Sequence, residues 1–146
     1  MIVVIEPGVA IKWFVEEPLR LQARSLLVHG HRLIAPDILI AGVAELAWMK
    51  TTTGEIGLDQ AKSIVRSIDL PGFISTFVDS AYLRHRALAL ALQCGLPVHA
   101  CFYAACAEDA SAALVSDNED FLQTLKAEGI AVHCVALSRI HELADA

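Results

Sequence analysis

The feature that most constrains the fold is a run of consecutive apolar residues at 1–5 (MIVVI), which ends at the turn sequence Glu6-Pro7-Gly8. A run of this length without a polar position is typical of a strand buried on both faces, as in the middle of a parallel sheet. Further strands, alternating with helical segments, are expected at 32–35, 73–78, 112–116 and 130–135. This alternation predicts an α/β fold with a mainly parallel central sheet, helices on both faces and one domain over residues 1–146.

Helices are expected between these strands, at 9–14, 18–28, 36–50, 58–68, 81–94, 99–109 and 117–128. Asp79 and Ser80 can cap the helix at 81–94. Ser116 and Glu119 match the spacing of a capping box, in which two side chains bond the backbone at the start of a helix. The tail at 136–146 is expected to be a weak helix or an extension of the sheet edge.

Composition excludes a disordered chain and favours a large core. Hydrophobic residues make up 55% of the 146 residues and charged residues 19%, which is the opposite of the balance that keeps a chain unfolded. A chain of this size and apolar content also favours burial of surface in a partner. A homodimer or a tight heterodimer is the simplest form of such burial.

No membrane association is expected. The most apolar region, Leu33 to Met49, contains Pro36, Asp37 and Glu45 and is too short to span a bilayer. The N-terminal run has no basic leader and no small-residue cleavage site, so we interpret it as a strand and expect a cytoplasmic protein. Buried free thiols of a reducing compartment are expected at Cys94, Cys101, Cys106 and Cys134.

Charge argues against a general nucleic-acid binder. The formal net charge of −6 excludes a long-range basic field. Arg84, His85 and Arg86 form a local basic cluster, for which we favour a solvated helix face, and Lys12 is a further candidate for a basic patch. His29-Gly30-His31 lies in a polar turn without a further ligand, which favours surface histidines over a metal site.

Polar and mostly acidic residues follow two of the predicted strands. Glu6 follows the strand at 1–5, and Asp117, Asn118, Glu119 and Asp120 follow the strand at 112–116. Open parallel sheets bind ligands beyond the carboxyl ends of their strands, and an acidic crevice there suggests divalent-metal and phosphate chemistry. Taken singly, each residue also has a structural explanation, as a turn residue, a cap or an acid that stabilises a helix dipole.

Three segments in order resemble the PIN-domain family, and in particular its VapC-type toxin ribonucleases. MIVVIEPGVAIKWFVEEP is similar to the family's V-V-D-x-S-V-A-x-K-W-F. LIAPDILIAGVAELAWMK is similar to A-P-x-x-x-x-x-E-V-x-N-x-L-W, and LPVHACFYAACAEDASAALVSDNEDF to P-V-Y-D-A-x-Y-x-A-x-A followed by L-V-T-x-D-x-x-F. The resemblance covers nearly the whole chain and implies a three-layer α/β/α PIN fold. It also implies descent from metal-dependent endoribonucleases, whose carboxylates hold Mg²⁺ or Mn²⁺.

The family's acidic positions, however, are mostly not acidic in this chain. The resemblance places the first Asp on Glu6, the helical Glu on Gly42, the Asp after P-V-Y on Ala100 and the last acidic position on Asn118. Only one of these four keeps a carboxylate. The matched polar positions are Glu45 for the family's Asn, Ser116 for its Thr and His99 for its Tyr. Lys12, Trp13, Phe14, Ala35, Pro36 and Trp48 match the family as scaffold residues.

The resemblance therefore implies a retained fold with a degenerate metal site. We expect no cofactor, no or very weak nuclease activity, and a role in binding protein or RNA, as a homodimer or with an antitoxin-type protein. Any residual metal is expected at Glu6 and Asp117. The pocket is expected to include Ser116, Glu119 and His99.

Two alternatives remain open. In the first, Glu6, Glu45 and Asp117 form a shifted metal triad in an active Mg²⁺- or Mn²⁺-dependent ribonuclease, since Glu45 lies one helical turn from Gly42. In the second, the pocket binds a small molecule, with His99, Cys101 and Ser116 in its lining.

Overall fold

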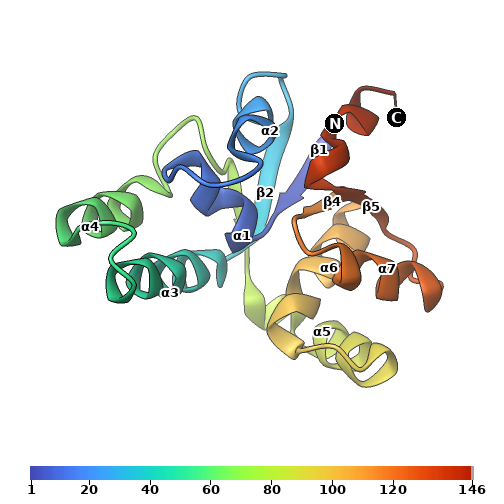
Figure 1. The fold of residues 1–146 in the computed structure, drawn as a ribbon. Coiled ribbons are helices and arrows are strands. Elements are labelled where there is room, and N and C mark those ends of the chain that lie inside the picture. Colours follow the sequence, from blue (N-terminus) through green and yellow to red (C-terminus); the bar gives the residue numbers. More distant parts are fainter. Residues whose placement is uncertain (146) are drawn as a thin grey trace.

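The computed structural model describes residues 1–145 and is built around one five-stranded sheet (Figure 1). Every neighbouring pair of strands is parallel. This confirms the predicted α/β class, and the helices that flank the sheet make three layers, α/β/α. The order in the sheet is β3-β2-β1-β4-β5, where the strands are β1 (Ile2–Ile5), β2 (Arg32–Pro36), β3 (Thr76–Val78), β4 (Ala113–Ser116) and β5 (His133–Ala136).

β1 lies in the middle of the sheet because its residues are apolar on both faces. Val3, Val4 and Ile5 have no exposed surface. The strand pairs with β2 on one side and with β4 on the other, where Ile5 is opposite Val115. This register brings the residues that follow β1 next to the residues that follow β4.

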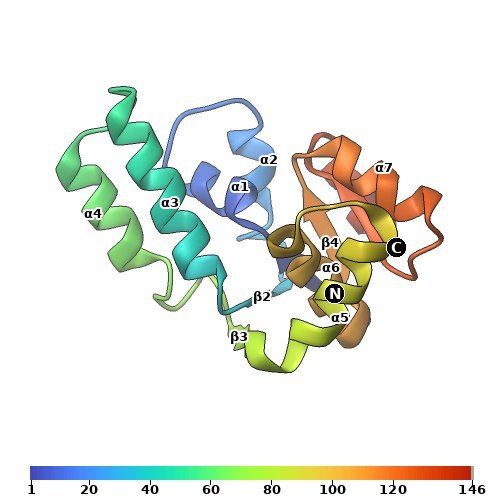
Figure 2. The same ribbon diagram turned by 90° about the horizontal axis from the view of Figure 1, so that it is seen from below.

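Some helices pack directly on the sheet, and others pack on those helices. α6 contacts β1, β2 and β4, and its buried Ala104, Ala105 and Ala107 permit a close approach, while α5 packs on α6. α3 and α4 form a hairpin that projects away from the sheet (Figure 2). The bounds are α1 (Pro7–Ala10), α2 (Arg20–Ser25), α3 (Leu39–Thr52), α4 (Leu58–Ser67), α5 (Ser80–Cys94), α6 (Val98–Ala110) and α7 (Glu119–Ala127), with 3-10 helices η1 (Ile11–Trp13) and η2 (Leu137–Asp145).

Several predicted element ends were wrong, because backbone hydrogen bonds and backbone conformation next to the element determine where it begins or ends. Pro36 ends β2 instead of opening the long helix, and the Asp37 N–H donates to the Val78 carbonyl over 2.9 Å, so α3 begins only at Leu39. The second helix is shorter than 18–28, because Leu19 before it is left-handed, with φ of 69°.

The edge strands are also shorter than predicted. β3 begins at Thr76 and not at 73, and β5 begins at His133 and not at 130. The tail forms η2, a 3-10 helix, and residue 146 lies outside the described residues. The predicted cap of α5 is confirmed, because Asp79 Oδ1 accepts from the Ala81 N–H over 2.9 Å.

The cysteines are free, as predicted, with Cys101, Cys106 and Cys134 buried and Cys94 half-buried. The predicted solvated face is also confirmed, since Arg84, His85 and Arg86 are exposed on α5. Lys12, in contrast, is only 7% exposed and belongs to no surface patch.

His29 is exposed, but His31 is half-buried, and its Nδ1 has no hydrogen-bond partner among the described residues. Within residues 1–145 no single helix is long and apolar enough to cross a membrane, and α5 and α6, bent by 115°, meet that criterion only as a pair.

Candidate functional site

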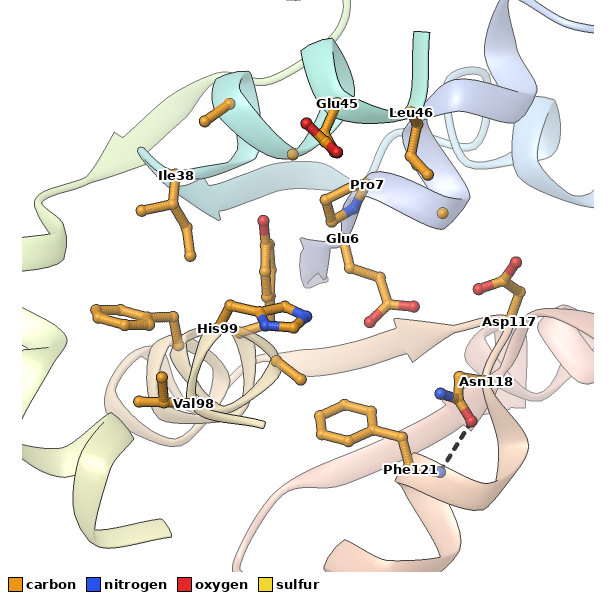
Figure 3. A pocket seen from close by; sticks show the side chains of 16 residues that line it. Glu6, Pro7, Ile38, Glu45, Leu46, Val98, His99, Asp117, Asn118 and Phe121 are labelled. Atoms are coloured by element: carbon orange, nitrogen blue, oxygen red, sulfur yellow. Dashed lines mark hydrogen bonds between the residues drawn. The ribbon is translucent and has the colours of Figure 1, made fainter. Parts of the chain in front are cut away.

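A cavity of about 690 Å³ lies beyond the carboxyl ends of β1 and β4, between α3 and α6 (Figure 3). The four positions that the resemblance makes acidic, Glu6, Gly42, Ala100 and Asn118, all line it. Its wall is otherwise mainly apolar. The complete lining is Glu6, Pro7, Gly8, Ile38, Ala41, Gly42, Glu45, Leu46, Val98, His99, Ala100, Phe102, Tyr103, Asp117, Asn118 and Phe121.

Glu6 is the acid at the centre of this site. It is the first residue after β1, and Figure 3 shows its carboxyl directed into the cavity. The Ser116 hydroxyl donates to Glu6 Oε1 and itself accepts from the Asn118 N–H over 2.9 Å. Burial raises the pKa of Glu6 to about 7; the Ser116 hydrogen bond lowers this pKa and the nearby Asp117 carboxylate raises it. Glu6 is thus a proton-binding group near neutral pH.

Asp117 lines the same cavity but is paired with a cation. Its Oδ2 lies 3.3 Å from Lys12 Nζ, and the same Nζ lies 2.8 Å from Glu17 Oε1. A Cβ at Gly8 would lie 2.7 Å from Asp117 Oδ1, so a larger residue at position 8 would displace this carboxylate. Asp117 is thus paired with the buried Lys12 at the rim of the cavity, and the missing side chain at Gly8 leaves room for its carboxylate.

At Gly42, the position of the family's helical Glu, the Pro7 ring occupies the space that a side chain would need. A Cβ built on Gly42 would lie 2.4 Å from Pro7 Cγ, closer than two carbon atoms can approach. Any side chain at position 42 therefore requires movement of the Pro7 ring. Ala100, at the next acidic position, offers no ligand atom.

Glu45 reaches the cavity from α3 and is exposed. The three acids of the shifted triad, Glu6, Glu45 and Asp117, thus line one cavity. However, no group of three His, Cys, Asp or Glu side chains in the described chain is placed to hold one metal ion.

The capping-box prediction was wrong. Asn118 is the N-cap of α7, because its Oδ1 accepts from the Phe121 N–H over 3.1 Å (Figure 3). Ser116 cannot take this role because it is the last residue of β4, it has no exposed surface, and its hydroxyl donates to Glu6.

The predicted pocket residues are therefore only partly in the cavity. His99 lines it, whereas Ser116 lies behind the wall formed by Glu6. Glu119 points instead to a smaller cavity of about 100 Å³ beside η2, because it lies on the first turn of α7 beyond the Asn118 cap. Cys101 is fully buried and does not belong to the lining of either cavity.

Sequence reasoning missed the apolar and phenolic part of the site. Phe102 and Tyr103 follow His99 by three and four positions on α6, a spacing that places them on one helix face and that could have found them. Tyr103 is 3% exposed, and burial, followed by the charge of Glu6, raises the pKa of its phenol.

Taken together, the arrangement offers an amide, an imidazole, a phenol and two acids without a salt bridge in the described chain, Glu6 and Glu45, in a mainly apolar cavity. Such a lining is suited to holding a ligand, because a few polar groups orient what the apolar wall encloses. No protein-family model and no curated protein matches this chain. Membership of the PIN-domain family therefore stays a prediction from the three sequence segments.

Proposed function

We propose that this protein is a PIN-like, VapC-toxin-like domain of the cytoplasm that has lost metal-dependent nuclease chemistry and acts by binding. One observation carries the proposal: of the four cavity positions that the resemblance makes acidic, only Glu6 bears a carboxylate, and the Pro7 ring occupies the space at Gly42. Because Pro7 fills the space that a side chain at position 42 would need, the proposal is a complete loss of the metal site and not an exchange of one ligand for another.

The electrostatics of the two remaining acids support the same proposal. Mg²⁺ binds through oxygen ligands in octahedral geometry and requires concentrated negative charge. Glu6 is the one carboxylate left at the four aligned positions, and one of its oxygens already accepts a hydrogen bond from the Ser116 hydroxyl. Asp117 is paired with Lys12, whose ammonium group repels a nearby cation. RNA cleavage by this class of enzyme depends on the metal that these residues fail to attract.

A protein partner or a second copy of the chain is part of the proposal. The α3–α4 hairpin exposes large apolar side chains, among them Trp48 at 59% and Leu58 at 70%. Exposed apolar surface of this kind is typical of interaction sites. RNA without cleavage remains an alternative ligand.

A calorimetric titration with Mn²⁺, followed by an RNA-cleavage assay, tests the proposal. We expect no saturable binding up to millimolar metal and no cleavage above a metal-free control. The positive control is a variant with the acids restored, Gly42→Glu, Ala100→Asp and Asn118→Asp, with Pro7→Ala to make room. Saturable Mn²⁺ binding in the unmodified protein that disappears in Glu6→Ala would refute the loss of the metal site.

An active ribonuclease with the shifted triad is the second candidate, because Glu6, Glu45 and Asp117 do line one cavity. It requires that Lys12 release Asp117 when metal binds. This candidate predicts Mn²⁺-dependent RNA cleavage that is lost in Glu45→Gln while the protein stays folded. Equal activity of Glu45→Gln and the unmodified protein would remove it.

A further inference from the structure

We infer that the cavity beyond β1 and β4 binds a small organic cation, with an ammonium or amidinium group against Glu6 and a flat apolar body between α3 and α6. The inference rests on the proposed function, because a metal ion at Glu6 would take the place of the organic cation. It adds the chemical class of the ligand to that proposal.

The size and the wall of the cavity suit a small molecule. A volume of about 690 Å³ lies within the range of sites for cofactors and drug-sized ligands, which is roughly 300–1,000 Å³. Ile38 and Leu46 from α3, Phe102 from α6 and Phe121 from α7 give it apolar sides. A flat apolar body buried here would leave water and gain contact with aromatic faces.

Charge defines the polar end of the ligand. Within the described chain no Lys or Arg forms a salt bridge with Glu6, whereas Asp117 is paired with Lys12. Glu45 adds a further acid at the side of α3, and the one basic group in the lining is His99. The cavity therefore favours a positive group and repels an anion.

The surroundings of Glu6 favour an organic cation over a bare ion. Ser116 already donates to Oε1, so the carboxyl is fixed in direction. The rings of Phe121 and Tyr103 line the same space and attract a cation through their faces.

The inference is tested by a titration of the metal-free protein with benzamidine, in which NMR measures binding and a chelator is present. Benzamide and benzoate serve as neutral and anionic probes of the same shape. We expect benzamidine to bind at least about tenfold more tightly than benzamide, as one charge-assisted hydrogen bond in a buried site provides. Benzoate should not bind. Equal affinities for benzamidine and benzamide, or no binding of benzamidine up to tens of millimolar, would overturn the inference.

A matched pair of variants shows which carboxylate causes the preference for benzamidine over benzamide. Glu6→Gln and Glu45→Gln remove the same charge from one cavity, at its centre and at its side. Glu6→Gln should bring the benzamidine-to-benzamide ratio close to one, and Glu45→Gln should keep most of the preference. Equal losses in the two variants would show that general acidity suffices and would overturn the role of Glu6. If Glu6→Gln does not fold, Ala100→Leu, which narrows the cavity, must weaken both probes for the inference to stand.

The pH dependence gives a second readout. Glu6 faces Asp117 and Ser116 beyond β4, Glu45 on α3, and His99 and Tyr103 on α6, with Lys12 behind Asp117. Because the ionised carboxyl binds the cation, affinity for benzamidine should rise as the pH increases through about 7. His99 is the one basic side chain in the described lining, so the rise must persist in the control variant His99→Gln.

The two proposals fail separately. A Glu6-dependent Mn²⁺ site would refute the proposed function. Equal binding of benzamidine and benzamide by protein that binds no Mn²⁺ would refute the organic-cation site alone.

Discussion

Two enclosed glutamates of this protein, Glu17 and Glu6, have opposite electrostatic surroundings. Glu17 Oε1 lies 2.8 Å from Lys12 Nζ and its Oε2 lies 2.6 Å from Lys50 Nζ. Burial by itself raises the pKa of Glu17, but the two lysines outweigh it, and the net pKa is lowered. Glu6 is enclosed without a cation, and burial raises its pKa to about 7.

The difference lies in which acids are paired with Lys12 and Lys50. Lys12, which is buried, connects Glu17 with Asp117, and the half-buried Lys50 connects Glu17 with the exposed Glu55, so these ions pair with one another from the interior to the surface. Such a network is structural. The Glu6 cavity lies beside it and leaves a carboxyl without a counter-charge, which costs stability and is typical of a site that binds something.

Removal of Lys12 should produce the largest effect. Lys12→Met keeps the buried stem but leaves Asp117 and one oxygen of Glu17 without a cation. Breaking a largely buried ion pair by removing one partner should lower the free energy of unfolding by about 3 kcal/mol, measured by urea denaturation.

Lys62→Met is the control for this prediction. Lys62 is exposed on α4, so the same change of charge there should cost less than about 0.5 kcal/mol. A similar loss in both variants would mean that net charge and not the Glu17 network determines the effect.

The next largest effect should be a difference between Glu6 and Glu17 in how each affects the pH dependence of the unfolding free energy. The folded-state pKa of Glu6 is raised, so the folded protein holds a proton that the unfolded chain loses above its own pKa near 4.5. Its contribution therefore declines as the pH rises from 4.5 to about 7. Glu6→Gln should gain about 2 kcal/mol relative to the unmodified protein between about pH 5 and about pH 8.

Glu17→Gln should show the opposite sign. Because the pKa of Glu17 is lowered, its stabilisation is present above the unfolded pKa and is lost as the pH falls through the folded one. The variant should be destabilised at neutral pH and should approach the unmodified protein in acid. Parallel pH profiles of the two variants, measured by urea denaturation, would contradict the comparison.

The sequence predicted the fold better than it predicted the site. The order of strands and helices followed from apolar runs and breakers, and the four positions that the resemblance makes acidic, Glu6, Gly42, Ala100 and Asn118, lie around one cavity. The ends of α3 and β2 did not follow, because Asp37 pairs with Val78, a residue distant in sequence.

Side-chain roles in the site depend on neighbours that the sequence does not reveal. Ser116 and Glu119 have the spacing of a capping box, yet the Ser116 hydroxyl donates to Glu6, which follows the neighbouring strand β1. Lys12 was considered for a surface patch, but Glu17 and Asp117 enclose it. Only the fold brings these partners together.

Gly42 tests how closely the cavity wall has adapted to the absence of a carboxylate. In a helix interior Gly→Ala normally stabilises a protein by up to about 1 kcal/mol. Here a Cβ would lie 2.4 Å from Pro7 Cγ, so Gly42→Ala should instead destabilise the protein. We expect a net loss of about 1–2 kcal/mol by thermal or urea unfolding.

Pro7→Ala in the same chain supplies the control. The double variant should recover most of the loss, because the clashing ring is gone, and the two changes should not be additive. A stabilising Gly42→Ala with no dependence on residue 7 would show that the position is open. It would also weaken the case against a carboxylate there.

Asn118 should give the smallest effect. Its Oδ1 caps α7 by accepting from the Phe121 N–H over 3.1 Å, so Asn118→Ala should cost about 1 kcal/mol. Asp caps as well as Asn and favours the start of a helix, and this gain opposes repulsion from Glu6 and Asp117. Asn118→Asp should therefore change the unfolding free energy by less than about 0.5 kcal/mol and raise the pKa of Glu6 further.

This pair of variants asks why a carboxylate is missing from a position that can carry one. If Asn118→Asp is as stable as the unmodified protein, neither the cap nor the charge of the cavity requires an amide at this position, and stability does not explain the missing carboxylate. If Asn118→Asp loses as much as Asn118→Ala, repulsion within the Glu6 cavity is the reason. The unpaired Glu6 would then limit every acid placed beside it, whether or not a ligand binds.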